Sequence, residues 1–544
     1  MIEDNNQKPC FVQTSQGFSV SYKNHFLYSK YNPSKVIVQT IEKLQVLPGT
    51  VFLCFSPVLG YGLSELLQKL QKDCLVFLIE ADSELFELAR TQITFSSYKD
   101  KVSFISCDEL ANFPVKLYEM ARTGKYKRVV RLDFSAGTQF FSNFYDNFTS
   151  ACTNSIMTFW KNRLTLTKFG RHYSYNFFRN LKNLPNSVPI TNYIHKIEKP
   201  ILLLGAGQSL DSLFLQEIDF SNYFIICVDT SLHPLLKRNI LPDAVFIEEA
   251  QSIILKAFIG IPHNKKIHYF AGLSSVPYLC EKTGLENISF FTTKYDDTSF
   301  IKKYLNLSIM PPENPPFGSV GLTSFYYALK FRKSNDVPVF FAGLDFSYST
   351  GKTHAKGTLA HIQKLINHNR ITQIENYSAS FNSQAIKFAD KNNSVFFTSP
   401  SLKSYADLFI SLFRDEKNIF DISDCGYPLE KIPRLNVSQM NQITDGMKNT
   451  KENFILDKSE NHSNEQINEL LQLLKKEKEE LQYLKMLLTE KTDFSKEELQ
   501  QKISALASEK EYLFLHFPDG YSFRYEQSFL NRIRTEIDFF LKAF

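Results

Sequence analysis

The centre of the chain contains the run Ile201-Leu202-Leu203-Leu204-Gly205-Ala206-Gly207-Gln208-Ser209-Leu210-Asp211. Four apolar residues lead into two glycines and then into Ser209, a hydroxyl residue at the expected start of a helix. Glycines at such a turn let the backbone approach a ligand closely, and the amides of a helix N-terminus favour an anionic group. Many strand-to-helix turns need glycine for packing alone, so the turn by itself leaves a ligand site and a structural role equally open.

Apolar runs typical of buried strands recur on both sides of this turn, and stretches with a helical pattern separate them. This alternation predicts an α/β fold with parallel sheets. The runs are Val51–Phe55, Leu75–Ile79, Val102–Ser106 and Val129–Leu132 in the first part of the chain, and Ile201–Leu204, Phe224–Val228, Ala244–Ile247, Ile267–Phe270, Ile288–Phe291 and Val337–Ala342 in the centre.

Changes in composition divide the chain into three predicted domains. Residues 1–190 are expected to form a Rossmann-like α/β domain, and residues 191–430 a second α/β domain that binds the ligand. Pro200 stands directly before the first strand of that second domain, as a boundary residue would. Residues 431–544 begin with a polar stretch, 435–463, that is typical of a linker. Leucines at helical spacing follow it and predict a coiled-coil-like helical region, which could pack on the core or join two copies of the chain.

The composition indicates an intracellular globular protein. The 544 residues include 62 Lys+Arg and 57 Asp+Glu with no basic tail, so nucleic acid is not an expected partner. Eight scattered cysteines without a C-x-x-C pair predict buried free thiols in a reducing compartment and argue against a zinc site. The polar N-terminus has no signal-peptide pattern, and no apolar run approaches the ~20 residues that span a bilayer. We therefore expect a cytoplasmic protein without a membrane span.

Acidic residues flank two further central strands. Asp229 follows the strand Phe224–Val228, while Asp243 precedes and Glu249 follows the strand Ala244–Ile247. An acid at the carboxyl end of such a strand is where doubly wound sheets hold ribose hydroxyls. Together with the glycine turn, these acids predict one ligand crevice along the sheet edge.

A second helix start and a polar loop complete the pattern. Gly318-Ser319 opens the helical stretch Leu322–Phe331, and Ser319 could donate to a phosphate there. The later run Gly343-Leu344-Asp345 follows a buried strand and leads into a loop that contains Lys352 and His354. His354 is our candidate general base, because imidazole titrates near neutrality. The alternatives are a solvent-exposed loop histidine and, for Lys352, a solvated charge.

The order of these motifs resembles that of the motility associated factor (Maf) family of flagellin glycosyltransferases. The matching motifs are Gly205-Ala206-Gly207-Gln208-Ser209-Leu210, Pro242-Asp243, Gly318-Ser319-Val320, and Gly343-Leu344-Asp345 followed by His354-Ala355. The central domain of that family is shared with archaeal 6-hydroxymethylpterin diphosphokinase-like proteins and is similar to sialyltransferases, which implies a GT-A type domain here.

The resemblance implies transfer of a nonulosonic acid, pseudaminic or legionaminic, from its CMP ester to Ser or Thr of flagellin, as needed for flagellar assembly and motility. It implies inversion, no divalent metal and no cofactor besides the CMP-sugar substrate. Asp345 and His354 would be catalytic. The nucleotide-sugar would be bound by Gly205, Ala206, Gly207, Gln208, Ser209, Asp229, Asp243, Glu249, Gly318, Ser319 and Gly343.

Two residues depart from the pattern of the family. Proline is usual where Gln208 stands, and aspartate is usual near Glu249. Two alternatives therefore stay open. One is a diphosphokinase that moves pyrophosphate from ATP with magnesium held by carboxylates such as Asp229, Asp243 and Asp345. The other is a factor that binds flagellin without catalysis.

The first predicted domain also contains a glycine turn, Gly60-Tyr61-Gly62, followed by an acid, Glu80. The pair resembles a methyltransferase-like Rossmann loop. The first glycine position of such a fingerprint is taken here by Ser56-Pro57, and proline is poorly suited to it. We expect a structural α/β domain or a flagellin-docking module.

Overall fold

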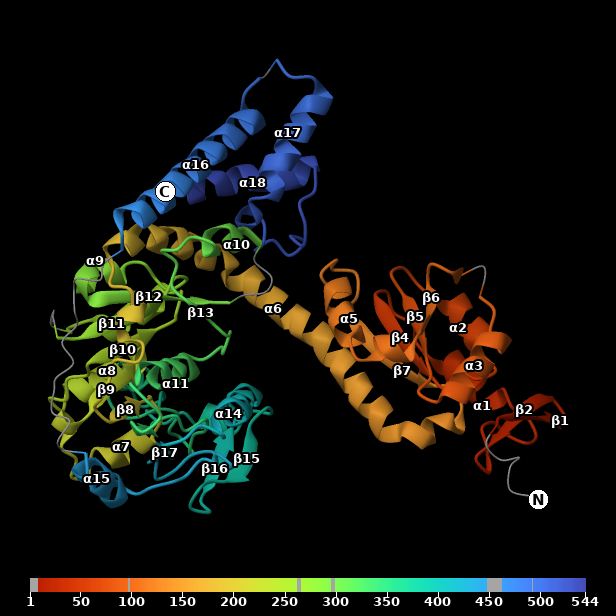
Figure 1. The fold of residues 1–544 in the computed structure, drawn as a ribbon, viewed down its shortest axis with the longest axis horizontal. Coiled ribbons are helices and arrows are strands. Elements are labelled where there is room, and N and C mark those ends of the chain that lie inside the picture. The colour runs from red at the N-terminus through yellow and green to blue at the C-terminus, as the bar shows by residue number, and fades with distance from the viewer. Residues whose placement is uncertain (1–7, 96–97, 262–265, 295–298, 448–461, 492) are drawn as a thin grey trace. The chain divides into compact units, whose positions relative to one another are not determined.

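The computed structural model describes residues 8–95, 98–261, 266–294, 299–447, 462–491 and 493–544 (Figure 1). The chain forms two compact units. The N-terminal unit comprises Met1–Lys168 and Leu515–Phe523, and the central unit comprises Phe169–Phe514 and Arg524–Phe544. Among the described residues, no helix is both long and apolar enough to cross a membrane.

The N-terminal unit is built on a four-stranded parallel sheet with the order β6-β5-β4-β7. All four strands predicted from apolar runs are confirmed. They are β4 (Thr50–Phe55), β5 (Leu75–Ile79), β6 (Val102–Ile105) and β7 (Arg128–Asp133). The other elements are the antiparallel strands β1 (Cys10–Thr14), β2 (Gly17–Tyr22) and β3 (His25–Phe26), and the helices α1 (Lys35–Lys43), α2 (Leu63–Lys69), α3 (Ser83–Gln92), α4 (Cys107–Leu110) and α5 (Phe113–Ala121).

The central unit is built on an eight-stranded parallel sheet with the order β13-β12-β11-β10-β9-β8-β14-β17. The six strands predicted here are confirmed, and the two short edge strands were not predicted. The order changes direction between β8 and β14, the position at which doubly wound sheets bind ligands. The strands are β8 (Ile201–Leu204), β9 (Phe224–Val228), β10 (Ala244–Ile247), β11 (His268–Gly272), β12 (Ile288–Thr293), β13 (Glu313–Asn314), β14 (Val339–Ala342) and β17 (Ile419–Asp421).

Aromatic side chains fill the core on one face of this sheet. Helices α11 (Val320–Phe331) and α14 (Pro400–Phe413) pack there, and Phe325 of α11 contacts Phe341 of β14 and Phe409 of α14. Burying each such ring stabilises the fold by about 1.5–3 kcal/mol. The remaining elements are α7 (Ser209–Leu213), α8 (Asp229–Leu236), α9 (Leu279–Thr283), α10 (Ser299–Leu305), α12 (Leu359–Ile366), α13 (Tyr377–Ser380), β15 (Ile386–Ala389) and β16 (Val395–Thr398).

The boundaries of the two units differ from the predicted domain boundaries. Helix α6 (Ser142–Asn183) spans the first unit boundary, which lies between Lys168 and Phe169. Its early residues pack in the N-terminal unit, where Trp160 contacts Tyr521. Its later residues pack in the central unit, where Phe178 contacts Tyr512. A boundary near residue 190, inferred from prolines, could not reveal a helix shared by both units.

The helices predicted near the C-terminus are present as α16 (Asn464–Thr489), α17 (Lys496–Ser508) and α18 (Gln527–Phe540). The apolar face of α16 is buried within the chain, next to α17 and α18. The expectation of an unstructured linker over 435–463 is wrong in its first part. Helix α15 (Val437–Asp445) forms there because an Asn436–Gln439 capping box starts it and Met440 is buried. Residues 448–461 of the predicted linker lie outside the described residues.

Among the cysteine side chains that the structure describes, six are buried free thiols, as predicted, whereas Cys10 is exposed. The buried ones are Cys54, Cys74, Cys152, Cys227, Cys280 and Cys425.

Candidate active site

The glycine turn after β8 lies directly against the turn after β14. The amide of Gly205 donates to the carbonyl of Ala342 (2.8 Å), and that of Gly207 donates to the carbonyl of Gly343 (2.9 Å). A methyl group on Gly205 would lie 2.3 Å from the Gly343 oxygen, and one on Gly207 would lie 2.4 Å from Asp345 Oδ2. Both glycines are therefore required by the packing of the two turns at the switch point of the sheet.

The buried side chain of Asp345 links the two turns through hydrogen bonds with Ser209. The Asp345 side chain is 2% exposed. Oδ2 accepts a hydrogen bond from the Ser209 amide (2.9 Å), Oδ1 accepts one from the Ser209 hydroxyl, and that hydroxyl accepts one from the Gly343 amide (2.9 Å). Burial raises the pKa of Asp345 to about 6, although the hydrogen bonds from Ser209 oppose the shift. Ser209, predicted to bind the nucleotide, thus makes its hydrogen bonds to Asp345.

The loop that carries His354 is fastened to the glycine turn. The Ala355 amide donates to the carbonyl of Ala206 (3.0 Å), and Gln208 Oε1 accepts hydrogen bonds from the amide and hydroxyl of Ser349 (3.1 and 2.7 Å). His354 itself is exposed, with Nδ1 3.1 Å from the Thr353 hydroxyl, and partial desolvation lowers its pKa. The structure therefore brings His354 beside the turn predicted to bind the nucleotide.

The start of α11 lies next to the same junction. A methyl group on Gly321 would lie 2.8 Å from Leu344 Cδ2, so the first helical turn touches the turn after β14. Ser319 is the N-cap residue, but its side chain makes no capping hydrogen bond, and the preceding Gly318 is exposed with φ 69°. Amides of an uncapped helix start are available to an anionic ligand.

Glu248, which the sequence analysis did not select, lies at the carboxyl end of β10. Its two oxygens accept hydrogen bonds from the hydroxyls of Thr293 (3.0 Å) and Thr323 (2.9 Å). Burial raises its pKa. Thr323 belongs to the first turns of α11, so Glu248 belongs to the same edge of the site. The signal was its position directly after the buried run 244–247.

Asp229 and Glu249 lie at this edge too, after β9 and β10. Burial raises the pKa of Asp229 to about 6, and the charges of Glu249 and Glu248 add to the shift. Glu249 accepts a hydrogen bond from the Gln251 amide (2.9 Å). Within the described residues, no group of three or more His, Cys, Asp and Glu side chains could hold a metal ion.

Asp243 is not brought to the site. It precedes β10, so it lies at the amino edge of the parallel sheet, opposite Glu248. There its carboxylate accepts a hydrogen bond from the Ile225 amide (2.7 Å). Its inclusion among the predicted ligand-binding residues is corrected on this geometry: Asp243 joins β9 to β10.

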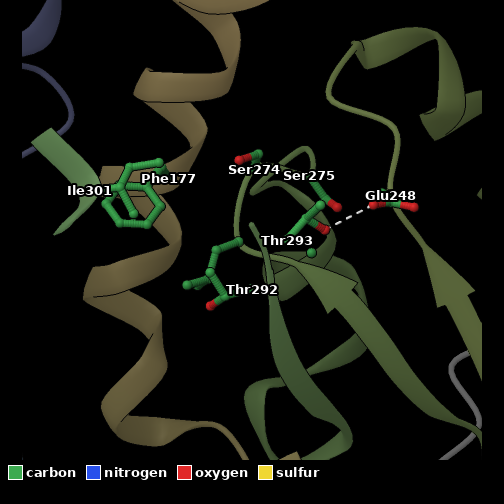
Figure 2. Close-up of a pocket in the computed structure, with 9 residues that line it drawn as sticks. Phe177, Glu248, Ser274, Ser275, Thr292, Thr293 and Ile301 are labelled. Atoms are coloured by element: carbon green, nitrogen blue, oxygen red, sulfur yellow. Dashed lines mark hydrogen bonds between the residues drawn. The ribbon is translucent and has the colours of Figure 1, made fainter. Parts of the chain in front are cut away.

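A small cavity adjoins Glu248 (Figure 2). Hydroxyl side chains after β11 and at the end of β12 line one side, and Phe177 and Ile301 line the other. The Thr292 hydroxyl is buried there without a hydrogen-bond partner. The cavity has room for about one water molecule. Its lining residues are Phe177, Glu248, Gly272, Leu273, Ser274, Ser275, Thr292, Thr293 and Ile301.

The loop that leads into the glycine turn of the N-terminal unit, residues 56–59, packs against other parts of the chain. The Tyr28 hydroxyl donates to the carbonyl of Pro57 (3.0 Å) and accepts from the amide of Leu59 (3.0 Å). A methyl group on Gly137 would lie 2.3 Å from the Ser56 hydroxyl, so the turn after β7 closely approaches the loop after β4. These contacts favour the structural role of this unit over cofactor binding.

Comparison with known proteins shows what the central unit and the whole chain are similar to. Residues 175–351 match the family described as 6-hydroxymethylpterin diphosphokinase MptE-like. An uncharacterized protein from Treponema pallidum (strain Nichols) is 31% identical over an alignment 567 positions long, which covers 98% of this chain and 94% of that protein. The chain belongs to the family of this treponemal protein.

The solved structure of the MAf glycosyltransferase from Magnetospirillum magneticum AMB-1 has a similar fold. The TM-score is 0.55 at 12% sequence identity, and the match covers 98% of this chain and 91% of that one. Residues 175–351 thus match an MptE-like domain, and the chain has the fold of a Maf glycosyltransferase over nearly its full length. The MptE-like match includes the turn Gly205–Gly207 after β8, the turn at Gly343 after β14 and the start of α11. It ends three residues before His354.

Replacing Gly207 by alanine is expected to disrupt this junction. The added methyl group would meet both the carboxylate of Asp345 (2.4 Å) and the carbonyl of Gly343 (2.8 Å). Overpacking of this kind costs about 1–3 kcal/mol. Thermal denaturation measures the loss. Gly446→Ala is the matched control, because its nearest contact is at 3.4 Å and its φ is −64°. Equal effects of the two substitutions would contradict the packing role of Gly207.

Proposed function

We propose that this protein is an inverting glycosyltransferase that moves a nonulosonic acid of the pseudaminic or legionaminic type from its CMP ester to Ser or Thr of flagellin. The observation that supports it is the arrangement at the switch point between β8 and β14. Two interlocked glycine turns, the uncapped start of α11 and the His354 loop lie together there. The fold of a Maf glycosyltransferase is the expected scaffold for this chemistry.

Each part of the arrangement has a role in the proposed reaction. The amides at the start of α11 bind the phosphate of the donor and stabilise the charge that develops on it as CMP leaves. His354 accepts the proton of the acceptor hydroxyl, which then attacks the anomeric carbon from the side opposite CMP. Direct displacement inverts that carbon. Amides take the place that a divalent metal has in other sugar transferases.

The magnesium-dependent diphosphokinase is the second candidate, because residues 175–351 match the MptE-like family. The carboxylates invoked for it do not converge, since Asp243 lies at the opposite edge of the sheet and Asp345 is buried against Ser209. A flagellin-binding factor without catalysis is the third candidate, and Gln208 is its support. In the structure Gln208 hydrogen-bonds Ser349 and so lies within the same loop contact.

The test is a transfer assay with purified protein, flagellin and either CMP-pseudaminic or CMP-legionaminic acid in the presence of EDTA. We expect the mass of flagellin to rise by one or more sugar residues, and CMP at a hundred times its dissociation constant to stabilise the protein by about 2.7 kcal/mol. The control reaction contains ATP, magnesium and 6-hydroxymethylpterin. Pterin diphosphate in the control with unmodified flagellin in the test would overturn the proposal in favour of the diphosphokinase.

A further inference from the structure

The segment that follows the His354 loop exposes apolar side chains. Helix α12 (Leu359–Ile366) has no buried residue, although its apolar and polar residues are segregated on opposite faces. Ile366, its last residue, is 75% exposed, and beyond the helix Ile371 is 91% and Phe381 73% exposed. Single exposed apolar residues are common, but a group of them within one short segment is typical of an interaction site.

This segment is held in place by the loop of the candidate site. The Asn376 amide donates to the carbonyl of Gly351 (2.8 Å), and the Tyr348 hydroxyl donates to the carbonyl of Ala379 (3.0 Å). The same loop contacts the glycine turn through Ala355 and Ala206. Helix α12 begins directly after its N-cap Thr358, four residues beyond His354. A polypeptide that places a hydroxyl at His354 therefore has to pass close to α12.

The segment is also basic. Residues 359–386 contain Lys364 and Arg370 but one acid, Glu375, and Lys352, Lys356 and Lys387 flank them. Apolar side chains among positive charges favour a partner that offers an apolar stripe flanked by acidic residues.

We propose that residues 359–386, the acceptor-docking segment, bind an acidic amphipathic stretch of the acceptor protein and so present its hydroxyl to His354. This inference rests on the proposed function, because the acceptor is the protein substrate of that reaction. Proximity to His354 favours the acceptor over a lipid surface or a second copy of the chain, neither of which needs to reach that residue.

The test compares two multiple variants of the full-length protein. The first is Ile366→Ser/Ile371→Ser/Phe381→Ser in the acceptor-docking segment. The matched control is Leu215→Ser/Ile259→Ser, which removes apolar side chains that are 84% and 68% exposed elsewhere in the central unit. Flagellin encoded by the same organism is the probe, and binding is measured by calorimetry at low and high salt. Hydrolysis of the CMP-sugar in the absence of flagellin reports on the donor site.

We expect the triple variant to bind flagellin at least tenfold more weakly, with unchanged donor hydrolysis, and the control variant to match the wild type. A Lys364→Glu/Arg370→Glu variant is expected to weaken binding most at low salt, because salt screens the charges.

Three outcomes would overturn the proposal. The triple variant could bind flagellin as tightly as the wild type, or the wild type could fail to bind flagellin. In the third outcome, the triple variant loses binding to vesicles or to a second copy of the chain but keeps its affinity for flagellin. Vesicles of phosphatidylcholine with phosphatidylglycerol and sedimentation of the free protein test the last of these. If the wild type binds flagellin through this segment but transfers no sugar, docking stands and the proposed function fails.

Discussion

Glu477→Gln is expected to lower the free energy of unfolding by about 3–5 kcal/mol, as breaking a buried ion pair does. Glu477 is 1% exposed and lies in a polar cluster inside the central unit. It accepts hydrogen bonds from Lys510 Nζ (3.0 Å), from the Tyr512 hydroxyl (2.6 Å) and from Lys303. Glutamine keeps the shape of the side chain but removes its charge, and Lys510, which is fully buried, then retains Glu480 as its remaining acidic partner.

The loss is expected to depend on pH. Burial opposes ionisation of Glu477, but the charges of Lys510 and Lys303 prevail and hold its pKa below the ordinary value. The carboxylate therefore stabilises the fold above the pKa it has in the unfolded chain, and this contribution is lost as pH falls through the lowered pKa of the folded state. The difference between variant and wild type should be full at pH 7 and should shrink in acid.

Urea denaturation at pH 7 and at a series of acidic pH values measures both effects. Glu479→Gln on the same helix is the matched control, since Glu479 is 61% exposed and pairs with the exposed Lys475 at 3.9 Å. Surface pairs contribute ~0–1 kcal/mol. If Glu477→Gln at pH 7 is no more destabilised than Glu479→Gln, the ionised Glu477 does not stabilise the fold as predicted.

Strands were predictable where the sheet is buried. Strands β5, β8, β9, β10 and β14 are continuous apolar runs, which the sequence shows directly. The edge strands β13 and β17 were missed because they are two and three residues long, and β13 consists of Glu313 and Asn314. Helix α15 was missed because the sequence around it is polar. Its buried residues are one apolar residue, Met440, and the polar Thr444.

The site was predictable to the extent that its residues directly follow strands. Glycine spacing identified Gly205 and Gly207, but the reason for them, the carbonyl of Gly343, required the fold. Asp243 could have been excluded from the sequence, because a residue that precedes a parallel strand lies at the amino edge. Glu249 was selected in place of Glu248. The contact that places Glu248 at the site is its hydrogen bond with Thr323, which joins residues 75 positions apart in the sequence.

His354→Asn is expected to lower kcat for sugar transfer by about 10²–10⁴-fold while CMP binding stays unchanged, because a general base contributes about that much. Desolvation lowers the pKa of His354, so the imidazole is neutral at pH 7 and ready to accept a proton. In the wild type, kcat should rise with pH as His354 loses its proton and then level off. This rise should be absent from the variant. His172→Asn, which changes an exposed histidine of α6, is the control and should leave the profile intact.

The outcome decides between two groups at the same edge of the sheet. The pKa of Glu248 is raised by burial, whereas that of His354 is lowered, and both Glu248 oxygens already accept hydrogen bonds from Thr293 and Thr323. His354 is exposed, and its ring contacts Thr353 alone among the hydrogen bonds seen for it, so it is the better placed to meet an acceptor from solution. If His354→Asn keeps kcat within tenfold of the wild type and Glu248→Gln removes the pH-dependent rise, then Glu248 is the base. The acceptor hydroxyl would then have to enter the site between β10 and the start of α11.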